Sequence, residues 1–493
     1  MKKKEKMYMK AKKISALLLA AAMTACAVPA QGAAADEPKV PKYIFLFIGD
    51  GMSYPQVQTT NYYLNAIEDD GDDILTSESK LNMMKFPVAG SAQTYDSTSF
   101  CPDSASTATS ISTGHKTYSG TINMDEKMET SYETIAEKLK KQLGYKVGIL
   151  SSVNLNHATP AAFYAHNENR KNYNAIGHDL VAAGFDFYGG ADFWGVTPQD
   201  SIGLYDLARS NGYTITRGYK EFQKKARMSD RMILFQKIAV SKIDSRTTPY
   251  AIDRQKTDLT LSEITRAGIK VLTKDPKKGF FFMIEGGSID WACHSNDAAT
   301  VIHEVQDLDR AIGVAYEFYQ QHPDETLIVV TADHETGGLG LGTGSYELNL
   351  SVLSNQKISE REFSKVLGNL RKKYNGLVSW DIVKNSLSEN FGFWKKIRLT
   401  LQQEERLKIA YESSFINSAS LVESEYQKDE TIAAEAKKII NEIALVDWIS
   451  KGHSASFVPV FALGAGAENF QSRTDNAEIP RKIAEIGGYG LED

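Results

Sequence analysis

Three strongly apolar, uncharged runs constrain the fold of this chain more than any other feature. They are Tyr43–Ile48, Gly279–Ile284 and Leu327–Val330. Strands that are buried on both faces read as continuous apolar runs, and such strands belong to parallel sheets covered by helices. Helical patterns lie between the runs, for example the apolar positions from Val301 to Tyr316. The sequence therefore predicts an α/β three-layer sandwich, with a central, largely parallel sheet flanked by helices.

Each of these strands is followed by residues that can bind a metal ion: Asp50, Glu285 with Asp290, and Asp333 with His334. The carboxyl ends of parallel strands meet at one edge of a sheet, where ligand sites of open α/β sheets lie. Asp290 and His294 have the i, i+4 spacing that lets two side chains hold one ion on a helical turn. A single such residue is more often a turn residue or an ordinary polar side chain. Together they predict a metal site at this edge.

A second feature is the stretch from Phe100 to Lys116, which reads F-C-P-D-S-A-S-T-A-T-S-I-S-T-G-H-K. Asp103 and Ser104 open its run of Ala, Ser and Thr, which we expect to form a helix. A Ser at a helix start lies among unpaired backbone N–H groups at the positive end of the helix dipole, a place for an anion. Asp-Ser before a helix is far more often only a cap. The acidic strand ends favour instead a Ser104 nucleophile that a metal activates.

Weaker patterns add further elements. Val88–Thr94 and Lys146–Leu150 read as strands, and a polar loop that includes His157 and Thr159 follows the second. Thr130 has capping-box spacing to the glutamate three residues later, before a helix that ends at a glycine. Residues 186–257 show no readable motif.

The late part of the chain differs in character. Residues 337–452 read mainly as helices with charged faces, and we expect them to form an insertion, a cap or crown, before the last strand, Phe457–Leu463. Proline cannot donate to a strand ladder, so Pro459 predicts an edge position for that strand.

The amino-terminal region has the pattern of an export signal. Residues 1–13 carry seven Lys and one Glu, and the uncharged run Ile14–Ala25 follows. This pattern predicts a leader over 1–35, and a periplasmic or cell-surface location, rather than a membrane span. Small residues at Ala30–Ala35 suit signal peptidase, whereas Cys26 after Met-Thr-Ala suits a lipoprotein anchor, and both alternatives stay open.

Charge and cysteine content exclude some classes of protein. Removing the seven lysines and one glutamate of the leader takes the formal charge from −6 to about −12, which disfavours nucleic-acid binding. Only Cys101 and Cys293 remain after the leader, too few for a disulfide framework. Whether these two pair or are two small buried side chains stays open.

Several motifs occur in one order along the chain: I-G-D-G-M at Asp50, P-D-S-A at Ser104, H-A-T-P to Y-A-H-N-E-N-R ending at Arg170, E-G-G-S-I-D-W-A-C-H ending at His294, and T-A-D-H-E-T at Asp333. With them the chain resembles the alkaline phosphatases, which are metal-dependent phosphomonoesterases of exported or membrane-anchored type. The resemblance spans nearly the whole mature chain. It implies one catalytic domain over 36–493, with the helical insertion at 337–452.

The resemblance implies two zinc ions and one magnesium ion per chain. The residues implied for the first zinc are Asp290, His294 and His453. Those implied for the second are Asp50, Asp333 and His334. The third position, for magnesium, would take Asp50, Thr159 and Glu285.

The resemblance also implies the chemistry. Ser104 would be the nucleophile, with Asp103 beside it, and Arg170 would grip the phosphate through a bidentate guanidinium. A bound divalent cation lowers the pKa of an oxygen nucleophile, and two cations stabilise the attacking and leaving oxygens of an in-line displacement. The implied reaction is hydrolysis of phosphate monoesters through a phosphoserine intermediate. Monomer and homodimer both stay open.

The chain departs from patterns known in the family at His157, at Trp291 and at the two residues after His453. The enterobacterial pattern has Asp where this chain has His157, and Lys where it has Trp291 directly after Asp290. Both lie beside the implied ligands, and the two replacements remove a cation near the phosphate and an acid near the third metal site. The family usually has His-Thr-Gly at the last ligand, whereas this chain has His453-Ser454-Ala455.

The motifs also bear on three alternative functions. A sulfatase needs C/S-x-P-x-R, and Cys101-Pro102 lacks that spacing and the Arg. A phosphodiesterase of the same superfamily often uses Thr as nucleophile, whereas Ser104 lies in a monoesterase-type D-S-A. A non-catalytic exported protein that binds phosphate or metal would need no nucleophile between two zinc sites.

Overall fold

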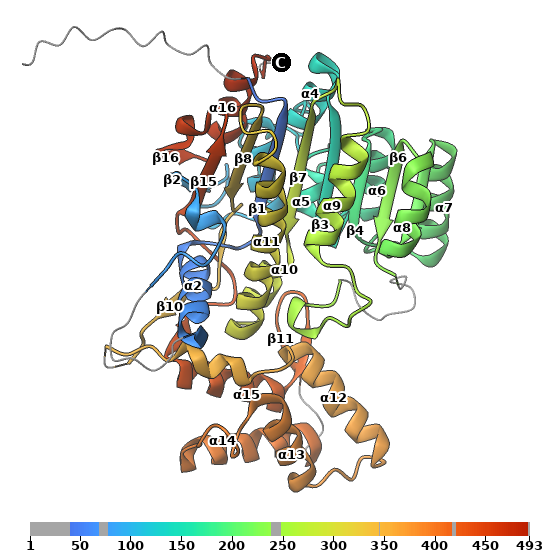
Figure 1. Cartoon of the computed structure of the whole chain (residues 1–493). Helices are drawn as coiled ribbons and strands as arrows, with labels where there is room; N and C mark the ends of the chain where they lie inside the picture. Colours follow the sequence, from blue (N-terminus) through green and yellow to red (C-terminus); the bar gives the residue numbers. More distant parts are fainter. Residues whose placement is uncertain (1–39, 69–76, 238–247, 345, 417–420, 492–493) are drawn as a thin grey trace, which may run out of the picture. The chain divides into compact units, whose positions relative to one another are not determined.

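A ten-stranded sheet forms the centre of the chain, in the order β16-β2-β15-β8-β1-β7-β3-β4-β6-β5 (Figure 1). The computed structural model describes residues 40–68, 77–237, 248–344, 346–416 and 421–491, so the predicted leader 1–35 and Cys26 lie outside the described residues. The three predicted apolar strands are central: β1 (Tyr43–Gly49), β7 (Phe280–Gly286) and β8 (Thr326–Thr331). All three are buried along their length, and β1 pairs in parallel with both others.

Parallel pairing continues to one side of this centre. Next to β7 come β3 (Lys146–Asn154), β4 (Phe187–Ala191), β6 (Arg231–Phe235) and β5 (Tyr213–Arg217). The last three strands come from the region 186–257, in which the sequence showed no motif. Each of these strands is short, so the alternation of apolar and polar residues that identifies a strand extends over too few positions to be recognised.

One strand runs against all the others. β15 (Val458–Gly464) pairs antiparallel with both β2 (Val88–Gln93) and β8, and β16 (Ser472–Asp475) forms the edge beyond β2. The prediction that Pro459 places this strand at an edge is therefore wrong. Pairing of β15 with β8 begins only at Phe461, so the missing N–H of Pro459 leaves no gap in that ladder. The Pro459 carbonyl instead accepts a hydrogen bond of 3.0 Å from Thr331 Oγ1.

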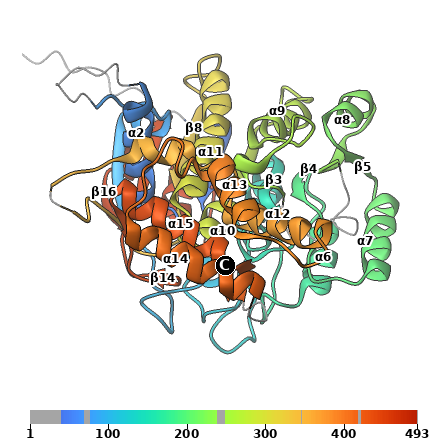
Figure 2. The same ribbon diagram turned by 90° about the horizontal axis from the view of Figure 1, so that it is seen from below.

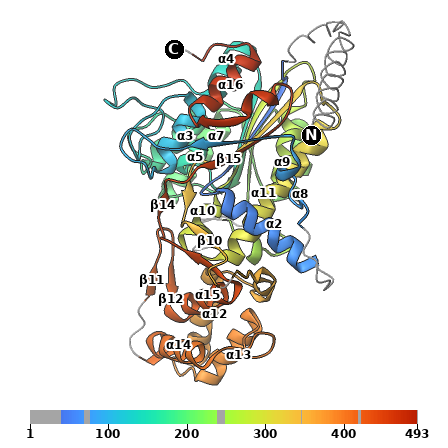
Figure 3. The ribbon, with the colours of Figure 1, turned by 90° about the vertical axis from the view of Figure 1, so that its left-hand side faces the viewer.

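Helices cover both faces of the sheet (Figure 3). On one face, α9 (Leu261–Leu272) packs against α11 (Ala298–Tyr319), and both contact β7. On the other face, α4 (Ile135–Leu143) and α5 (Ala158–Ala161) pack on β3, and α3 (Ser104–Thr113) packs on α5. The predicted α/β sandwich with a largely parallel sheet is confirmed.

The remaining helices of the sandwich are α2 (Tyr54–Glu68), α6 (Tyr173–Ala182), α7 (Pro198–Ser210), α8 (Tyr219–Lys225), α10 (Ser288–His294) and α16 (Glu478–Gly487).

The start of α4 corrects a detail of the sequence analysis. The capping box is formed by Thr134 and Glu137, not by Thr130 and Glu133. Both pairs have the same spacing. The helix begins after Thr134 because the next two side chains, Ile135 and Ala136, are buried. Gly144 ends the helix as predicted, at a φ of 65° that favours glycine.

Residues 337–452 carry a second apolar core. Its helices are α12 (Glu360–Lys373), α13 (Trp380–Phe391), α14 (Leu401–Tyr411) and α15 (Thr431–Ala444), seen from below in Figure 2. They bury Phe363, Leu387 and Ile439 among others. A hairpin of β11 (Leu421–Glu423) and β12 (Lys428–Glu430) precedes α15. The chain leaves this segment through β14 (His453–Ser454), which pairs with β9 (Glu335–Thr336) directly after β8. None of the helices in the described ranges is long and apolar enough to cross a membrane.

Candidate active site

The predicted ligands lie where the central strands end. Glu285 lies in β7 and is level with Ile48 of β1, two residues before Asp50. Thr331 of β8 is level with the same Ile48, two residues before Asp333. The parallel register therefore brings the three acidic side chains to one edge of the sheet, and all of them are fully buried.

Within the described ranges, three groups of side chains have ligand atoms within 4.8 Å of one another: Asp290 with His294 and His453, Asp50 with Asp333 and His334, and Asp50 with His157 and Glu285. The first two match the predicted zinc sets. The third contains the predicted Asp50 and Glu285, and Thr159 Oγ1 donates to Asp50 Oδ2 over 3.3 Å. It also contains His157, which the sequence analysis placed only beside the ligands.

In the first cluster, the two histidines direct their Nε2 atoms toward each other. One turn of α10 brings His294 Nε2 to 3.3 Å from Asp290 Oδ2, and His453 Nε2 lies 3.2 Å from His294 Nε2. His294 Nδ1 is bonded to the carbonyl of Lys451, and His453 Nδ1 to that of Pro102. A carbonyl only accepts, so each Nδ1 carries a proton and each Nε2 is directed into the cluster. Burial alone would lower the pKa of His294, but the Asp290 carboxylate raises it to about 9. The site thus favours positive charge, which a divalent cation would supply, and the carbonyls fix the ring orientations.

The second cluster lies beside Ser104. His334 Nε2 is 3.3 Å from Asp333 Oδ2, 3.5 Å from Asp50 Oδ1 and 3.2 Å from Ser104 Oγ. Thr336 Oγ1 links the two clusters, because it donates to Asp290 Oδ1 over 2.5 Å and lies 3.3 Å from His334 Nδ1. The candidate nucleophile therefore contacts the second cluster through His334, whose ring stacks on that of His453 of the first cluster at 3.6 Å.

The carboxylates of the three clusters fit divalent cations. Each has one buried oxygen without a hydrogen-bond partner: Asp50 Oδ1, Glu285 Oε1, Asp290 Oδ2 and Asp333 Oδ2. Burial, followed by the charge of Asp333, raises the pKa of Asp50 well above its ordinary value, and burial raises that of Glu285 to about 7. Four buried carboxylates this close repel one another and cost several kcal/mol each unless positive charge compensates them. Carboxylate and imidazole ligands together suit zinc.

Asp103 and Arg170 complete the surroundings of Ser104. Asp103 is the N-cap of α3 and accepts a hydrogen bond of 3.1 Å from Ser106 N, so Ser104 is the first helical residue. Arg170 Nη1 forms an ion pair of 2.8 Å with Asp103 Oδ2, and its Nη2 lies 3.3 Å from His157 Nε2. Burial alone would raise the pKa of Asp103, but the Arg170 charge and two backbone N–H groups hold it well below the usual range. Arg170 is thus tied to Asp103, the residue before Ser104, and its phosphate-binding role stays a prediction.

An aromatic wall of His157, Trp194, Trp291 and Tyr426 borders the clusters, and the sequence analysis missed Trp194 and Tyr426. Trp291 stacks on Tyr426, with ring centroids 4.5 Å apart and an interplanar angle of 12°. His157 stacks on Trp194 at 5.7 Å, and Trp194 meets Trp291 edge-on at 5.4 Å. Trp194 follows a strand end, which was a usable signal. Tyr426 comes from the β11–β12 hairpin, where no sequence motif points to it.

The two cysteines within the described ranges are free: Cys293 is buried and Cys101 is exposed. They do not pair, and only one of them is a small buried side chain.

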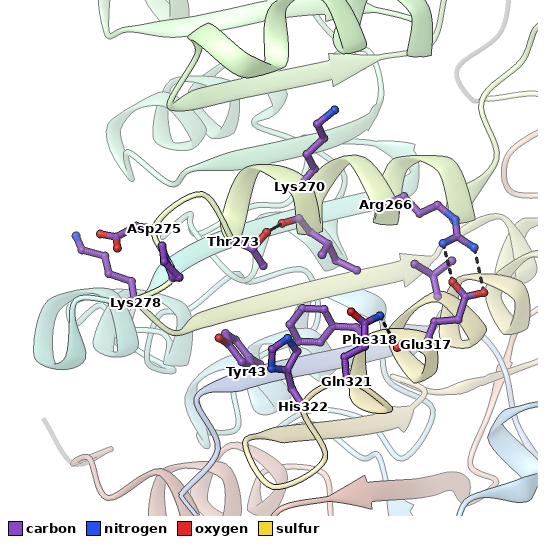
Figure 4. Close-up of a pocket in the computed structure, with 13 residues that line it drawn as sticks. Tyr43, Arg266, Lys270, Thr273, Asp275, Lys278, Glu317, Phe318, Gln321 and His322 are labelled. Carbon is purple, nitrogen blue, oxygen red and sulfur yellow. Dashed lines mark hydrogen bonds and ion pairs between the residues drawn. The ribbon is translucent and has the colours of Figure 1, made fainter.

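A separate pocket of about 580 Å³ opens between α9 and α11 (Figure 4). Tyr43, the first residue of β1, lines it together with Phe318 and His322, and an ion pair of 2.7 Å joins Arg266 to Glu317 at its rim. This pocket lies at the amino ends of the strands, away from the metal-binding clusters.

Comparisons with known proteins agree with one another. The family profile described as alkaline phosphatase matches residues 41–185 and 199–489. Alkaline phosphatase 4 of Bacillus subtilis is 29% identical over 462 residues, which cover 90% of this chain and 89% of that protein. Among solved structures, the cold-active alkaline phosphatase of the psychrophile Shewanella sp. is 27% identical, with a TM-score of 0.73, and the match covers 90% of this chain and 99% of that chain. A His-to-Asp mutant of the alkaline phosphatase from the Antarctic bacterium TAB5, with Mg bound in the M3 site, is 25% identical with a TM-score of 0.62, over 92% of this chain and 100% of that chain.

Proposed function

The chain belongs to the alkaline phosphatase family and is a phosphatase, and we propose that it hydrolyses phosphate monoesters to inorganic phosphate and an alcohol through a phosphoserine at Ser104. The observation that carries this proposal is the position of Ser104 Oγ, 3.2 Å from His334 Nε2 at the first turn of a helix. The neighbouring Arg170 suits the dianionic phosphate of a monoester. Family membership does not favour the phosphodiesterase alternative, and it argues against a non-catalytic binding protein.

We assign two zinc ions to the first two clusters, because each combines imidazole with carboxylate. For the third we propose magnesium, since Asp50, Glu285 and Thr159 offer oxygen ligands. The Mg in the M3 site of the TAB5 mutant supports a third metal position in this family. His157 adds an imidazole nitrogen, a ligand that zinc accepts more readily than magnesium. When bound, the ions lower the pKa of the Ser104 hydroxyl and offset the charge of the phosphate.

The residues of the chain then do the following. Ser104 Oγ loses its proton and attacks phosphorus, the bond from phosphorus to the leaving oxygen breaks, and the departing alcohol takes up a proton. Water next loses a proton and attacks the same phosphorus, the bond from phosphorus to Ser104 Oγ breaks, and Oγ takes up a proton, which releases inorganic phosphate and restores Ser104. Arg170 and the free N–H groups at the start of α3 face the phosphoryl oxygens. Because Asp103 holds Nη1 of Arg170, this guanidinium is already oriented before substrate arrives.

The test is acid quenching of the enzyme during turnover of an aryl phosphate, followed by identification of the labelled residue. We expect phosphoserine at position 104, and we expect Ser104→Ala to lower turnover by several orders of magnitude with unchanged zinc content. Ser110→Ala is the matched control, since it lies in the same buried helix and its hydroxyl bonds only to the Ser106 carbonyl. Label on another residue, or full turnover in Ser104→Ala, would refute the assignment.

Further proposals concern the cellular setting. We propose that the substrates are small phosphate monoesters and that the protein acts outside the cytoplasm, because the leader has the pattern of an export signal. The lipid anchor at Cys26 and the homodimer stay predictions.

A further inference from the structure

The proposed function sets a direction across the site. Ser104 Oγ lies at His334, in the second cluster. In phosphoryl transfer the attacking and leaving oxygens lie roughly in line on opposite sides of phosphorus. The leaving group must therefore face the cluster on the other side, which contains His294 and His453. Whatever surrounds His294 borders the alcohol portion of the substrate.

A loop of the 337–452 segment lies at that position. Residues 424–427 connect β11 to β12, and a hydrogen bond of 2.9 Å from Ser424 N to the Gln427 carbonyl closes the loop. The Tyr426 ring lies 5.3 Å from the His294 ring, edge-on, while one face covers Trp291. Glu425 Oε2 lies 3.5 Å from His294 Nε2. The helical insertion thus delivers two side chains to the leaving-group side.

The charges around this loop favour one kind of leaving group. Glu425 keeps 56% of its side chain exposed, so its carboxylate faces both His294 and the solvent from which substrate enters. Three cationic side chains near the loop have acceptors of their own: Lys428 pairs with Glu423 at 2.6 Å, Lys451 Nζ contacts the Glu423 carbonyl at 3.4 Å, and Arg170, whose charge acts on the Tyr426 hydroxyl, pairs with Asp103 at 2.8 Å. An aromatic wall beside a carboxylate is the combination that recognises ammonium groups.

We propose that the loop 424–427 is a leaving-group recognition element, in which Tyr426 forms the wall and Glu425 selects phosphate monoesters of cationic alcohols over those of anionic alcohols. The proposal rests on the proposed function and gives the helical insertion a role in substrate choice. It concerns the alcohol, whereas Arg170 and Ser104 act on the phosphate that all substrates share.

The experiment compares kcat/KM for three monoesters that differ in leaving-group charge: choline phosphate, glycerol 2-phosphate and phosphoglycolate. A unit charge about 6 Å away in a water-like dielectric changes kcat/KM about threefold, in opposite directions for a cation and an anion. Glu425→Gln should therefore lower the choline phosphate to phosphoglycolate ratio about tenfold. The wild-type preference should also shrink as ionic strength rises. Tyr426→Leu should raise KM for choline phosphate, whereas Tyr426→Phe, which keeps the aromatic face, should leave that KM at the wild-type value.

Glu423→Gln is the matched control, because it removes the same charge from the same hairpin at a side chain that pairs with Lys428. Its ratio should equal that of the wild type. An unchanged ratio in Glu425→Gln, or an equal change in Glu423→Gln, would overturn the proposal. So would a loss of zinc in Glu425→Gln, since Glu425 would then be a metal ligand. Failure of the wild-type enzyme to hydrolyse even glycerol 2-phosphate would instead overturn the proposed function, and this inference with it.

Discussion

Glu304 allows a quantitative prediction about stability, because it is a buried carboxylate outside the metal-binding clusters. It lies in α11, where its Oε1 accepts a hydrogen bond of 2.6 Å from Ala251 N, while Oε2 is buried without a partner. Burial, only partly offset by the Arg254 charge, raises the pKa of Glu304 from 4.5 to about 7. Such a difference corresponds to about 3 kcal/mol between the two protonation states.

The sign of the effect follows from linkage. Because the folded-state pKa of Glu304 lies above the unfolded value, its protonated form stabilises the folded protein at pH 4.5 and below. This contribution is lost as pH rises to about 7 and is fully lost above that. Glu304→Gln keeps an acceptor for Ala251 N and cannot ionise. The variant should therefore match the wild type near pH 4.5 and exceed it by about 3 kcal/mol at pH 8 and above.

The assay is urea unfolding of the metal-loaded protein, followed by fluorescence at several pH values between 4.5 and 8.5. Comparing variant with wild type cancels the other titrating groups, which both proteins share. Glu317→Gln is the control on the same helix, since Glu317 is exposed and its pKa is lowered by its hydrogen bond to Arg266. A stability difference that stays constant from pH 4.5 to 8.5, or that favours the wild type at high pH, would refute the argument.

Three further predictions concern the site. Chelation should inactivate the enzyme. His294→Ala and His334→Ala should each lose about one zinc per chain, because the two residues belong to separate clusters. An unchanged zinc content, measured by mass spectrometry, would contradict this. Trp291→Lys should tighten inhibition by inorganic phosphate about tenfold and slow turnover at alkaline pH, because it adds a positive charge near the phosphate; an unchanged inhibition constant would exclude this position as a determinant of product affinity. Asp103→Ala should raise KM, because Arg170 loses the partner that orients it. The variant should also lower the free energy of unfolding by about 1 kcal/mol, because α3 loses its N-cap. Equal KM values in variant and wild type would show that Arg170 needs no such partner.

The metal-binding edge of the sheet could be predicted from the sequence because a simple rule of parallel sheets applies to it. Asp50 and Asp333 follow long apolar strands, so their positions depend only on recognising those strands and knowing where their ends meet. Asp290 and His294 depend on a single helical turn. In each case the signal is local in sequence, and the long-range contact follows from the architecture.

Other parts of the site carry no such local signal. Tyr426 stacks on Trp291, which lies 135 positions earlier in the sequence. Its four-residue loop, Ser-Glu-Tyr-Gln, has the composition of an ordinary surface turn and carries no motif. The central position of the strand that contains Pro459 could not be predicted either. A proline shows that one backbone N–H is missing, but not that the pairing with β8 starts two residues later, at Phe461. His157 was recognised as unusual, yet only the folded chain shows that its ring joins Asp50 and Glu285.

The reversed direction of β15 has a consequence for the order in which the site is assembled. Asp50 and Asp333 follow the parallel strands β1 and β8, whereas the proposed ligand His453 precedes β15, directly after residues 337–452. During synthesis the cluster of Asp50, Asp333 and His334 is complete once residue 334 has been made. The cluster of Asp290 and His294 must wait for more than a hundred further residues. A nascent chain that stops within residues 337–452 therefore already carries the complete ligand set proposed at Ser104, but only two of the three ligands proposed for the leaving-group side.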